Sequence, residues 1–318
     1  MTLRVRVEHQ LEAPPLERDQ RLSRIVGIGL VRDGYAPVPP SGPAPWPASH
    51  FGLDEVTVFC EASPARQREA LAGCAVDVLT EAFFVEKLGI GFAAKMTLLS
   101  STSDERSAYA LLGADEARHM AAIAAHLGAR PDAGGVAPDD PFLTLLARVI
   151  DRGRLAPLSF LVQVVLEGWG VVHYRKLARH SRDPALRQTL SGIVKDEALH
   201  HGGGLAIVGR IGMSSADRRT AELALAQLLS MIQTGPQRIV SRLDATVGPL
   251  GRRQCTRAFA ELDTERRTGE QLQLLRGFIS RAPDLEARLE RRGLFTPLSA
   301  AQCAAVANDQ SRPGGDTR

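Results

Sequence analysis

Two copies of the motif Asp-Glu-Ala-x-His carry side chains of the types that bind metal ions. The copies read ADEARH at 114–119 and KDEALH at 195–200, and the motif occurs nowhere else in the chain. Residues three apart on an α-helix share one face about a turn apart, so a Glu and the His three residues later can reach one metal ion. The motif therefore predicts that Glu116 and His119 bind metal together, as do Glu197 and His200.

An internal repeat supplies two further carboxylates. A pair of metal ions in a helical bundle needs one carboxylate from each of two other helices, because oxygens complete the coordination. A shift of 81 residues places Glu86 on Glu167 without a gap, and each of them precedes the Glu of its motif by 30 residues. The same shift aligns Gly89 with Gly170, Lys95 with Lys176, Ser100 with Ser181, Asp115 with Asp196, Glu116 with Glu197 and His119 with His200. The predicted metal ligands and catalytic residues are Glu86, Glu116, His119, Glu167, Glu197 and His200.

Metal binding explains this set better than a surface location does. One Glu-x-x-His on a helix is usually a solvated pair, so either copy alone is a weak indication. Two copies on otherwise apolar helices are different, because buried carboxylates without compensation are costly and a metal ion removes that cost.

The candidate ligands fall within stretches of sequence that predict long helices. Apolar positions recur at helical spacing without a proline from about 65 to 101, which predicts one long helix. TSDE at 102–105 predicts the cap of a second helix that ends at Gly128. Further helices are predicted at 142–152, 156–180 and 183–211, the last beginning with the N-cap pair Asp183 and Pro184.

The flanking segments predict an extension at each end of this region. Residues 1–36 contain two strand-like runs, and the six prolines of 37–49 predict an extended connector. Helical patterns at 215–243 and 252–281 precede a tail, RPGGDTR, that is expected to be disordered. The predicted organisation is an N-terminal extension at 1–62, a helical bundle at 63–212 and a C-terminal helical extension at 213–318.

The order Glu, Glu-x-x-His, Glu, Glu-x-x-His on four helices resembles the ferritin-like carboxylate-bridged di-iron superfamily, over about residues 65–211. The resemblance implies an all-α fold, a ferritin-like four-helix bundle with additional C-terminal helices and a short N-terminal extension. It implies two iron ions as cofactor and O2 as co-substrate. A manganese and iron pair would use the same ligands, so the metal identity stays open.

An Asp before each motif Glu is similar to the bacterial multicomponent monooxygenase branch of that superfamily. By this resemblance, Asp115 and Asp196 would each hydrogen-bond the metal-bound His of the other copy and fix its orientation. Arg118 matches the branch in the first copy, whereas Leu199 departs from it in the second.

Several neighbouring residues have alternative interpretations. Glu81 could replace Glu86, because some ferritin-like proteins use a longer spacing, but the repeat places Val162 opposite Glu81 and favours Glu86. Gly89 and Gly170 could serve helix crossing or leave room for O2 or substrate. Tyr174 could pack in the core, transfer electrons or contact substrate. The remaining candidate histidines, which we expect at the surface or behind the ligands, are His126, His173, His180 and His201.

Composition limits the partners and the location. The net charge is +3, and 35 of the 39 basic residues are Arg, but no basic block with interleaved aromatic residues appears, so no nucleic-acid partner is expected. The four cysteines are scattered, which predicts neither disulfides nor a rubredoxin-type iron site. The N-terminus lacks the pattern of a signal peptide and no stretch of about 18 residues is wholly apolar, so we expect no membrane association and a cytoplasmic location.

Three functions are compatible with such a centre. The first is an oxygenase or oxidase that hydroxylates, N-oxygenates or desaturates a small organic substrate, with electrons from a separate reductase or ferredoxin, since no flavin, nicotinamide or iron–sulfur motif is visible. The segments outside the bundle, which could cap a pocket or build a homodimer, favour this function. The second is a ferroxidase or peroxidase of the ferritin and rubrerythrin type. The third is a non-catalytic helical scaffold with a structural metal site.

Overall fold

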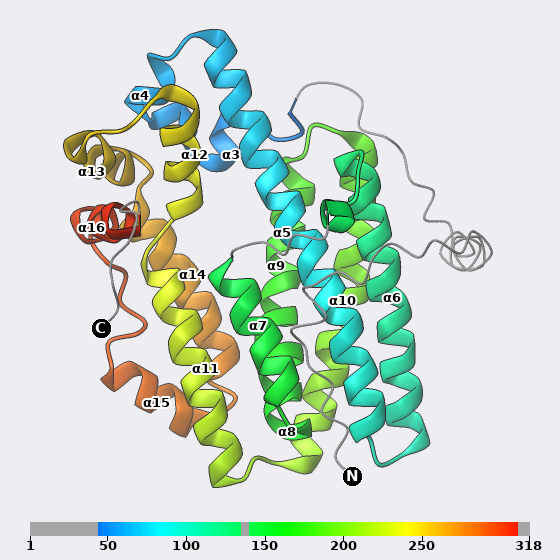
Figure 1. Cartoon of the computed structure of the whole chain (residues 1–318). Helices are drawn as coiled ribbons and strands as arrows, with labels where there is room; N and C mark the ends of the chain where they lie inside the picture. Colours follow the sequence, from blue (N-terminus) through cyan, green and yellow to red (C-terminus); the bar gives the residue numbers. More distant parts are fainter. Residues whose placement is uncertain (1–43, 135–139, 311–318) are drawn as a thin grey trace. The chain divides into compact units, whose positions relative to one another are not determined.

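The computed structural model describes residues 44–134 and 140–310, and every regular element in these two stretches is helical (Figure 1). The prediction of an all-α protein is therefore confirmed for this part of the chain. The two strand-like runs, most of the proline-rich connector and the C-terminal tail lie outside the described residues.

The described residues divide into two compact units. One contains Asp77–Ala224 and holds all six predicted metal ligands; the other contains the residues up to Val76 and those from Leu225 onward. The boundaries between these units lie at Val76/Asp77 and Ala224/Leu225, each inside a helix, rather than at the ends of the segments expected at 63–212 and 213–318. In the second unit, a Cβ at Gly73 would lie 2.6 Å from Arg242 Cδ, so the start of the first long helix packs closely against a distant segment. Helical periodicity carries no signal of such a long-range contact.

Three of the predicted long helices are confirmed, two of them with their predicted N-caps. α5 (Pro64–Leu99) and α6 (Ser103–Leu127) are joined by a short loop, where the hydroxyl of Thr102 accepts a hydrogen bond from Glu105 N at 3.2 Å. α6 ends at Gly128, whose φ of +73° lies in the left-handed region. α10 (Pro184–Ile211) begins as predicted, because the Asp183 carboxylate accepts from the amides of its first turn.

The helix predicted at 156–180 contains an irregularity that the sequence did not predict. It runs as α8 (Leu155–Leu158), a π-helical segment η3 (Ser159–Glu167) and α9 (Gly168–His180). A π-helix shifts the hydrogen bonds by one residue and is frequently found at functional sites. Here it ends at one of the predicted ligands, Glu167.

This helix is also the one stretch of the described residues that is long and apolar enough to cross a membrane. Leu155–His180 passes that test by length and composition, with 61% of its most apolar window buried inside the protein. The sequence-based expectation counted only unbroken apolar runs and so overlooked it. Core helices pass the same test, and Glu167 inside this helix faces the other predicted ligands.

The contact between α10 and η3 leads to a testable prediction. A Cβ at Gly204 would lie 2.3 Å from Gln163 Cβ and 3.3 Å from its backbone carbonyl carbon, whereas a Cβ at Gly202 would meet nothing within 4 Å. Gly204→Ala is therefore expected to lower the free energy of unfolding by about 1–3 kcal/mol through overpacking. Gly202→Ala, the matched control, should be neutral or stabilise by up to about 1 kcal/mol, because Ala favours the helix. Equal effects of the two variants in chemical denaturation would contradict this packing.

The C-terminal helices are more numerous than predicted. The pattern at 215–243 is two helices separated near Gly235, whose φ is +73°, and Pro236. The pattern at 252–281 is likewise broken at Asp263, a non-glycine residue with a left-handed φ of 51°. The segments after 281 were not predicted as helices. The helices of this region are α11 (Ser215–Gln233), α12 (Gln237–Val247), α13 (Arg252–Glu261), α14 (Thr264–Ile279), α15 (Pro283–Arg291) and α16 (Ala300–Gln310).

Short elements complete the two units. The proline-rich connector ends in the second unit, where Trp46 is buried just before the first short helix. The helix predicted at 142–152 is present in the first unit, capped by Asp140. These elements are α3 (Ala48–Phe51), η1 (Leu53–Glu55), α4 (Thr57–Cys60), η2 (Pro131–Gly134) and α7 (Pro141–Arg152).

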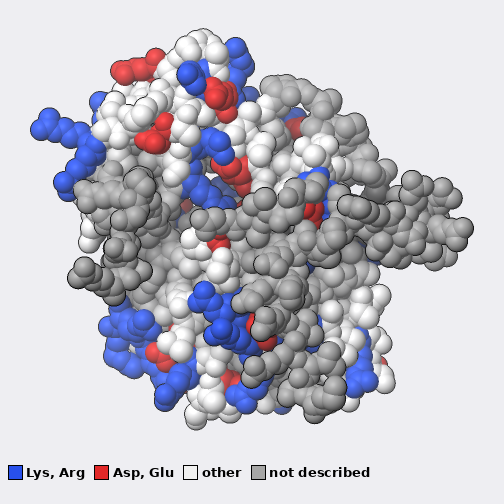
Figure 2. Space-filling model, in the orientation of Figure 1, with Lys and Arg blue, Asp and Glu red and all other residues white. Residues whose placement is uncertain are grey.

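Charged side chains of both signs are interspersed on the face shown in Figure 2. In the second unit, Arg276 pairs with Glu286 and Glu290 at 2.7 Å each. Exposed pairs of this kind contribute little to stability. The charge of Arg276 is thus paired with carboxylates, and the expectation of no nucleic-acid partner stays a prediction.

Candidate metal centre

Four helical stretches of the first unit contribute the side chains of the centre. Glu86 comes from α5, Glu167 from the end of η3, and each Glu-x-x-His pair from one turn of α6 or α10. All of these side chains are buried, with exposed fractions between 0% and 8%. The six residues are Glu86, Glu116, His119, Glu167, Glu197 and His200.

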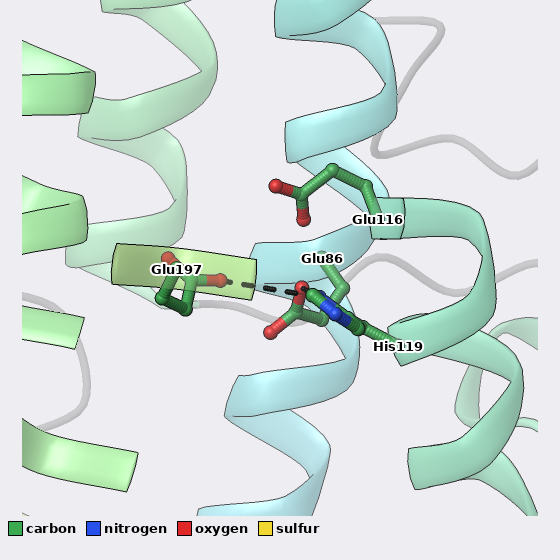
Figure 3. Close-up of side chains that lie close together, drawn as sticks. All are labelled: Glu86, Glu116, His119 and Glu197. Atoms are coloured by element: carbon green, nitrogen blue, oxygen red, sulfur yellow. Dashed lines mark hydrogen bonds and ion pairs between the residues drawn. The ribbon is translucent and has the colours of Figure 1, made fainter. Parts of the chain in front are cut away.

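The six side chains form two groups that share one residue. In the first group, Glu86, Glu116, His119 and Glu197 each place one ligand atom within 4.8 Å of the others (Figure 3). In the second, Glu116, Glu167 and His200 do the same. A carboxylate common to both groups is the arrangement expected when two ions share a bridging ligand. The structure thus brings all six predicted residues together, while Glu81, the alternative to Glu86, is half-buried and belongs to neither group.

The two imidazoles are oriented in the same way. His119 Nδ1 lies 3.1 Å from Glu86 Oε2 and His200 Nδ1 lies 3.4 Å from Glu116 Oε1, so both Nδ1 atoms face carboxylates of the centre. The Nε2 atoms lie on the opposite side, 3.1 Å from Asp196 and Asp115 respectively. A carboxylate that accepts from Nε2–H leaves Nδ1 as the lone-pair donor to a metal.

These hydrogen bonds cross between the two copies of the motif. Asp196 of the second copy bonds His119 of the first, and Asp115 of the first bonds His200 of the second. This is the arrangement that the resemblance implied. Arg118 pairs with Asp115 one turn away on α6, and Leu199 at the equivalent position of α10 is exposed.

Two buried atoms of the second group have no hydrogen-bond partner among the described residues. They are Glu167 Oε2 and His200 Nδ1. An unsatisfied buried polar group costs about 1–3 kcal/mol, so native proteins rarely leave one without a partner. Glu167 and His200 each offer a ligand atom to the second group, so the residues fit a bound cation.

The pKa values of the buried side chains indicate that the centre has too little positive charge to balance its carboxylates. Burial and the neighbouring carboxylates raise the pKa of Glu116 and of Glu167 well above the ordinary value. Burial, followed by the charge of Glu86, raises the pKa of Glu197 to about 8. Burial opposes protonation of His119, but its hydrogen bonds to Asp196 and Glu86 outweigh burial and raise its pKa to about 10. The carboxylates cannot all ionise at neutral pH without a cation between them.

Gly89 and Gly170 leave room for the ligands themselves. A Cβ at Gly89 would lie 2.6 Å from Glu116 Oε2, and a Cβ at Gly170 would lie 3.5 Å from Glu197 Oε2. The two repeat-related glycines therefore face the two motif glutamates. This role, room for the two carboxylates, is neither of the two that the sequence suggested, and room for O2 or substrate stays a prediction.

The difference between the two glycines predicts different effects of adding a methyl group. Gly89→Ala is expected to displace the Glu116 carboxylate and weaken metal binding by about 10–100-fold, as displacement of ligand-positioning groups typically does. Gly170→Ala, at an ordinary van der Waals distance, should change the affinity by less than about threefold. Competition with a chromophoric chelator measures both constants, and equal affinities would show that Glu116 is not held against Gly89.

Two buried hydrogen-bond donors near the centre were not predicted in these roles. The hydroxyl of Tyr174 donates to Glu86 Oε1, so Tyr174 contacts a predicted ligand directly. Gln163 accepts from Tyr109 at 2.8 Å, and its side-chain amide lies 3.3 Å from the carbonyl oxygen of His200. Gln163 is the lone polar residue in the apolar run FLVQVVL, which is a signal that the sequence offers.

The other candidate histidines lie outside the two groups. His126 is buried and bonds Thr189 at 3.0 Å, and His201 bonds the backbone carbonyl of Gln163 at 2.9 Å. His173 contacts the rings of Trp169 and Tyr174. None of the four candidates, including His180, contributes to the metal-ligand groups of the described residues.

The chain matches no protein-family model, no curated protein and no solved structure. The fold and the geometry of the centre therefore carry the functional argument.

Proposed function

We propose that the protein is a non-haem di-iron oxygenase or oxidase that uses O2 to oxidise a small organic substrate by hydroxylation, N-oxygenation or desaturation. The proposal includes a ferritin-like four-helix bundle built from α5, α6, the α8–η3–α9 helix and α10. The observation that supports it is the shared Glu116, because it belongs to both of the buried groups that could each hold a metal ion.

The ligand types are compatible with iron. Four carboxylates and two imidazoles give a mixed oxygen and nitrogen set that suits iron or manganese, and it contains none of the sulfur ligands that select copper(I) or iron–sulfur clusters. A ferrous pair held in this way supplies two electrons for the reduction of O2. A manganese and iron pair remains within the proposal, because it would use the same residues.

The residues of the chain would perform three tasks around that pair. Glu86, His119 and Glu197 would hold one ion and Glu167 and His200 the other, while Glu116, which belongs to both groups, would be shared. Asp115 and Asp196 fix the orientation of the imidazoles through Nε2. Burial of all six ligands keeps bulk water away, which protects a reactive site from side reactions.

This burial supports a resident cofactor rather than iron in transit. A ferroxidase passes its iron on, and so requires ions to enter and leave during turnover, whereas His119 is fully buried here and Glu86 is 1% exposed. The reaction would also require electrons from an external reductase or ferredoxin. That donor and the organic substrate are the partners we propose, with a homodimer as a further option for the surfaces outside the bundle.

The proposed function is tested by anaerobic loading of the metal-free protein with ferrous iron, followed by O2. We expect about two iron ions per chain, a transient visible absorption band after mixing with O2, and faster decay of that band with the correct class of substrate. Glu86→Ala should abolish the band and Glu81→Ala should retain it.

Two other outcomes would exclude the oxygenase proposal. Continuous oxidation of excess ferrous iron without an organic substrate would indicate a ferroxidase. Metal that raises the melting temperature but does not react with O2 would indicate a structural site in a helical scaffold.

A further inference from the structure

The two sides of the centre differ in one hydrogen bond. On the first side, Glu86 Oε1 accepts from the buried hydroxyl of Tyr174, and Glu86 Oε2 lies 3.1 Å from His119 Nδ1. On the second side, Glu167 Oε2 is buried without a hydrogen-bond partner in the described structure. One terminal carboxylate thus has both oxygens engaged, whereas its repeat-related counterpart has an uncommitted oxygen.

The internal repeat shows why the second side has no equivalent hydroxyl. Tyr174 follows Glu167 by seven residues, and the residue at the same spacing after Glu86 is Ala93. Ala93 is 1% exposed, and its methyl group lies 3.1 Å from where a Cβ at Gly113 would be. The close approach of α5 and α6 at this point leaves no space for a phenol ring, so the asymmetry is encoded in both helices.

The number of ligand atoms differs in the same direction. The group around Glu86 and His119 offers four ligand atoms, and the group around Glu167 and His200 offers three. A carboxylate that is already held in place loses less conformational freedom when it binds an ion. Both differences favour the first position.

We infer that Tyr174 is a positioning residue that makes the two metal positions unequal. By holding Glu86 toward His119, it makes the position at Glu86 and His119 the rigid one, which fills first. The position at Glu167 and His200 fills second, and Glu167 is the carboxylate that is free to change its mode of binding. The inference rests on the two-metal centre proposed above. It also predicts that two different metals offered in turn would occupy defined positions, the first at Glu86.

Calorimetric titration of the metal-free protein with Mn2+, combined with electron paramagnetic resonance, tests the inference. The wild type should show two binding steps separated by at least about tenfold, and isolated ions should dominate the spectrum at one equivalent. Tyr174→Phe removes only the hydroxyl and should weaken the first step by about 10–100-fold while the second changes by less than about threefold. Spin-coupled pairs should then appear already at one equivalent.

Two sets of control variants show which residues are responsible for each metal-binding step. Tyr109→Phe removes the hydroxyl of another buried tyrosine, which bonds Gln163 rather than a ligand, and should leave both steps unchanged. Glu86→Ala should remove the tight step, and Glu167→Ala should remove the weak one. This last pair tests which position fills first even if Tyr174→Phe fails to fold, and Tyr174→Leu then provides a second variant without the hydroxyl.

Equal steps in the wild type, unchanged steps in folded Tyr174→Phe, or an equal effect of Tyr109→Phe would overturn the inference while leaving the two-metal centre intact. An exchanged assignment of the steps in the two glutamate variants would do the same. Failure of the wild type to bind two ions would instead remove the proposed function itself.

Discussion

Glu116→Ala is expected to reduce the bound iron from two ions to at most one per chain. Glu116 is 5% exposed and belongs to both ligand groups, so its loss leaves three ligand atoms in the first group and two in the second. Two side chains are fewer than the three or more that hold a metal ion in most protein sites. The paired centre should therefore be lost, together with any reaction that needs both ions.

Iron analysis after removal of unbound metal measures this effect directly. Glu81→Ala is the matched control, because Glu81 lies on α5 near the centre and outside both groups; it should retain two ions. Circular dichroism should show equal helix content for the two variants. Two ions retained by Glu116→Ala would show that the shared carboxylate does not bridge a metal pair.

The second large effect is a loss of stability of the metal-free protein as the pH rises. Glu197 has a pKa of about 8 in the folded protein and an ordinary value of 4.5, because burial and the charge of Glu86 disfavour ionisation. Between these values the folded state holds a proton that the unfolded state has lost, so the free energy of unfolding falls with rising pH. His119, with a pKa of about 10 against 6.5, acts in the same direction above pH 6.5, because burial is outweighed by its hydrogen bonds to Asp196 and Glu86.

The expected slope is measurable by thermal unfolding. Glu197 alone contributes roughly 1.4 kcal/mol per pH unit inside its window, which for a chain of 318 residues corresponds to a fall in melting temperature of about 3–5 °C between pH 6 and pH 8. Bound metal replaces the protons, so the stabilisation by metal should grow over the same range. Glu197→Gln, which removes the titrating group, should reduce the slope of the metal-free protein. A metal-free protein that becomes more stable toward pH 8 would show that the buried carboxylates do not hold protons in the absence of a cation.

The side chains of the candidate centre could be predicted because the relevant signals are local and repeated. The spacing from Glu116 to His119 fixes a shared helix face, and the 81-residue repeat identifies Glu86 and Glu167 without knowledge of the packing. The caps at Thr102 and Asp183 act within one turn of their helices, so those helix starts were also predicted correctly.

The features that could not be predicted depend on contacts between distant segments. The π-helical segment η3 reads as an ordinary apolar helix, and its altered hydrogen bonds accompany the close packing of Gln163 against Gly204 of α10. The bond from Tyr174 to Glu86 joins residues 88 positions apart, and no spacing rule connects them. Gly235 and Asp263 adopt left-handed backbone conformations, which interrupt an α-helix. The apolar spacing around these two residues is still that of a helix, so the sequence pattern does not reveal the breaks.

Anomalous diffraction at the iron absorption edge, from crystals of the iron-loaded protein, tests the two-metal centre most directly. We expect two peaks in each chain, one among Glu86, Glu116, His119 and Glu197 and the other among Glu116, Glu167 and His200. The distance between the peaks should be about 3.5–4 Å, as in other two-metal sites. A single peak, or peaks away from Glu116, would show that the chain does not hold a metal pair at these residues.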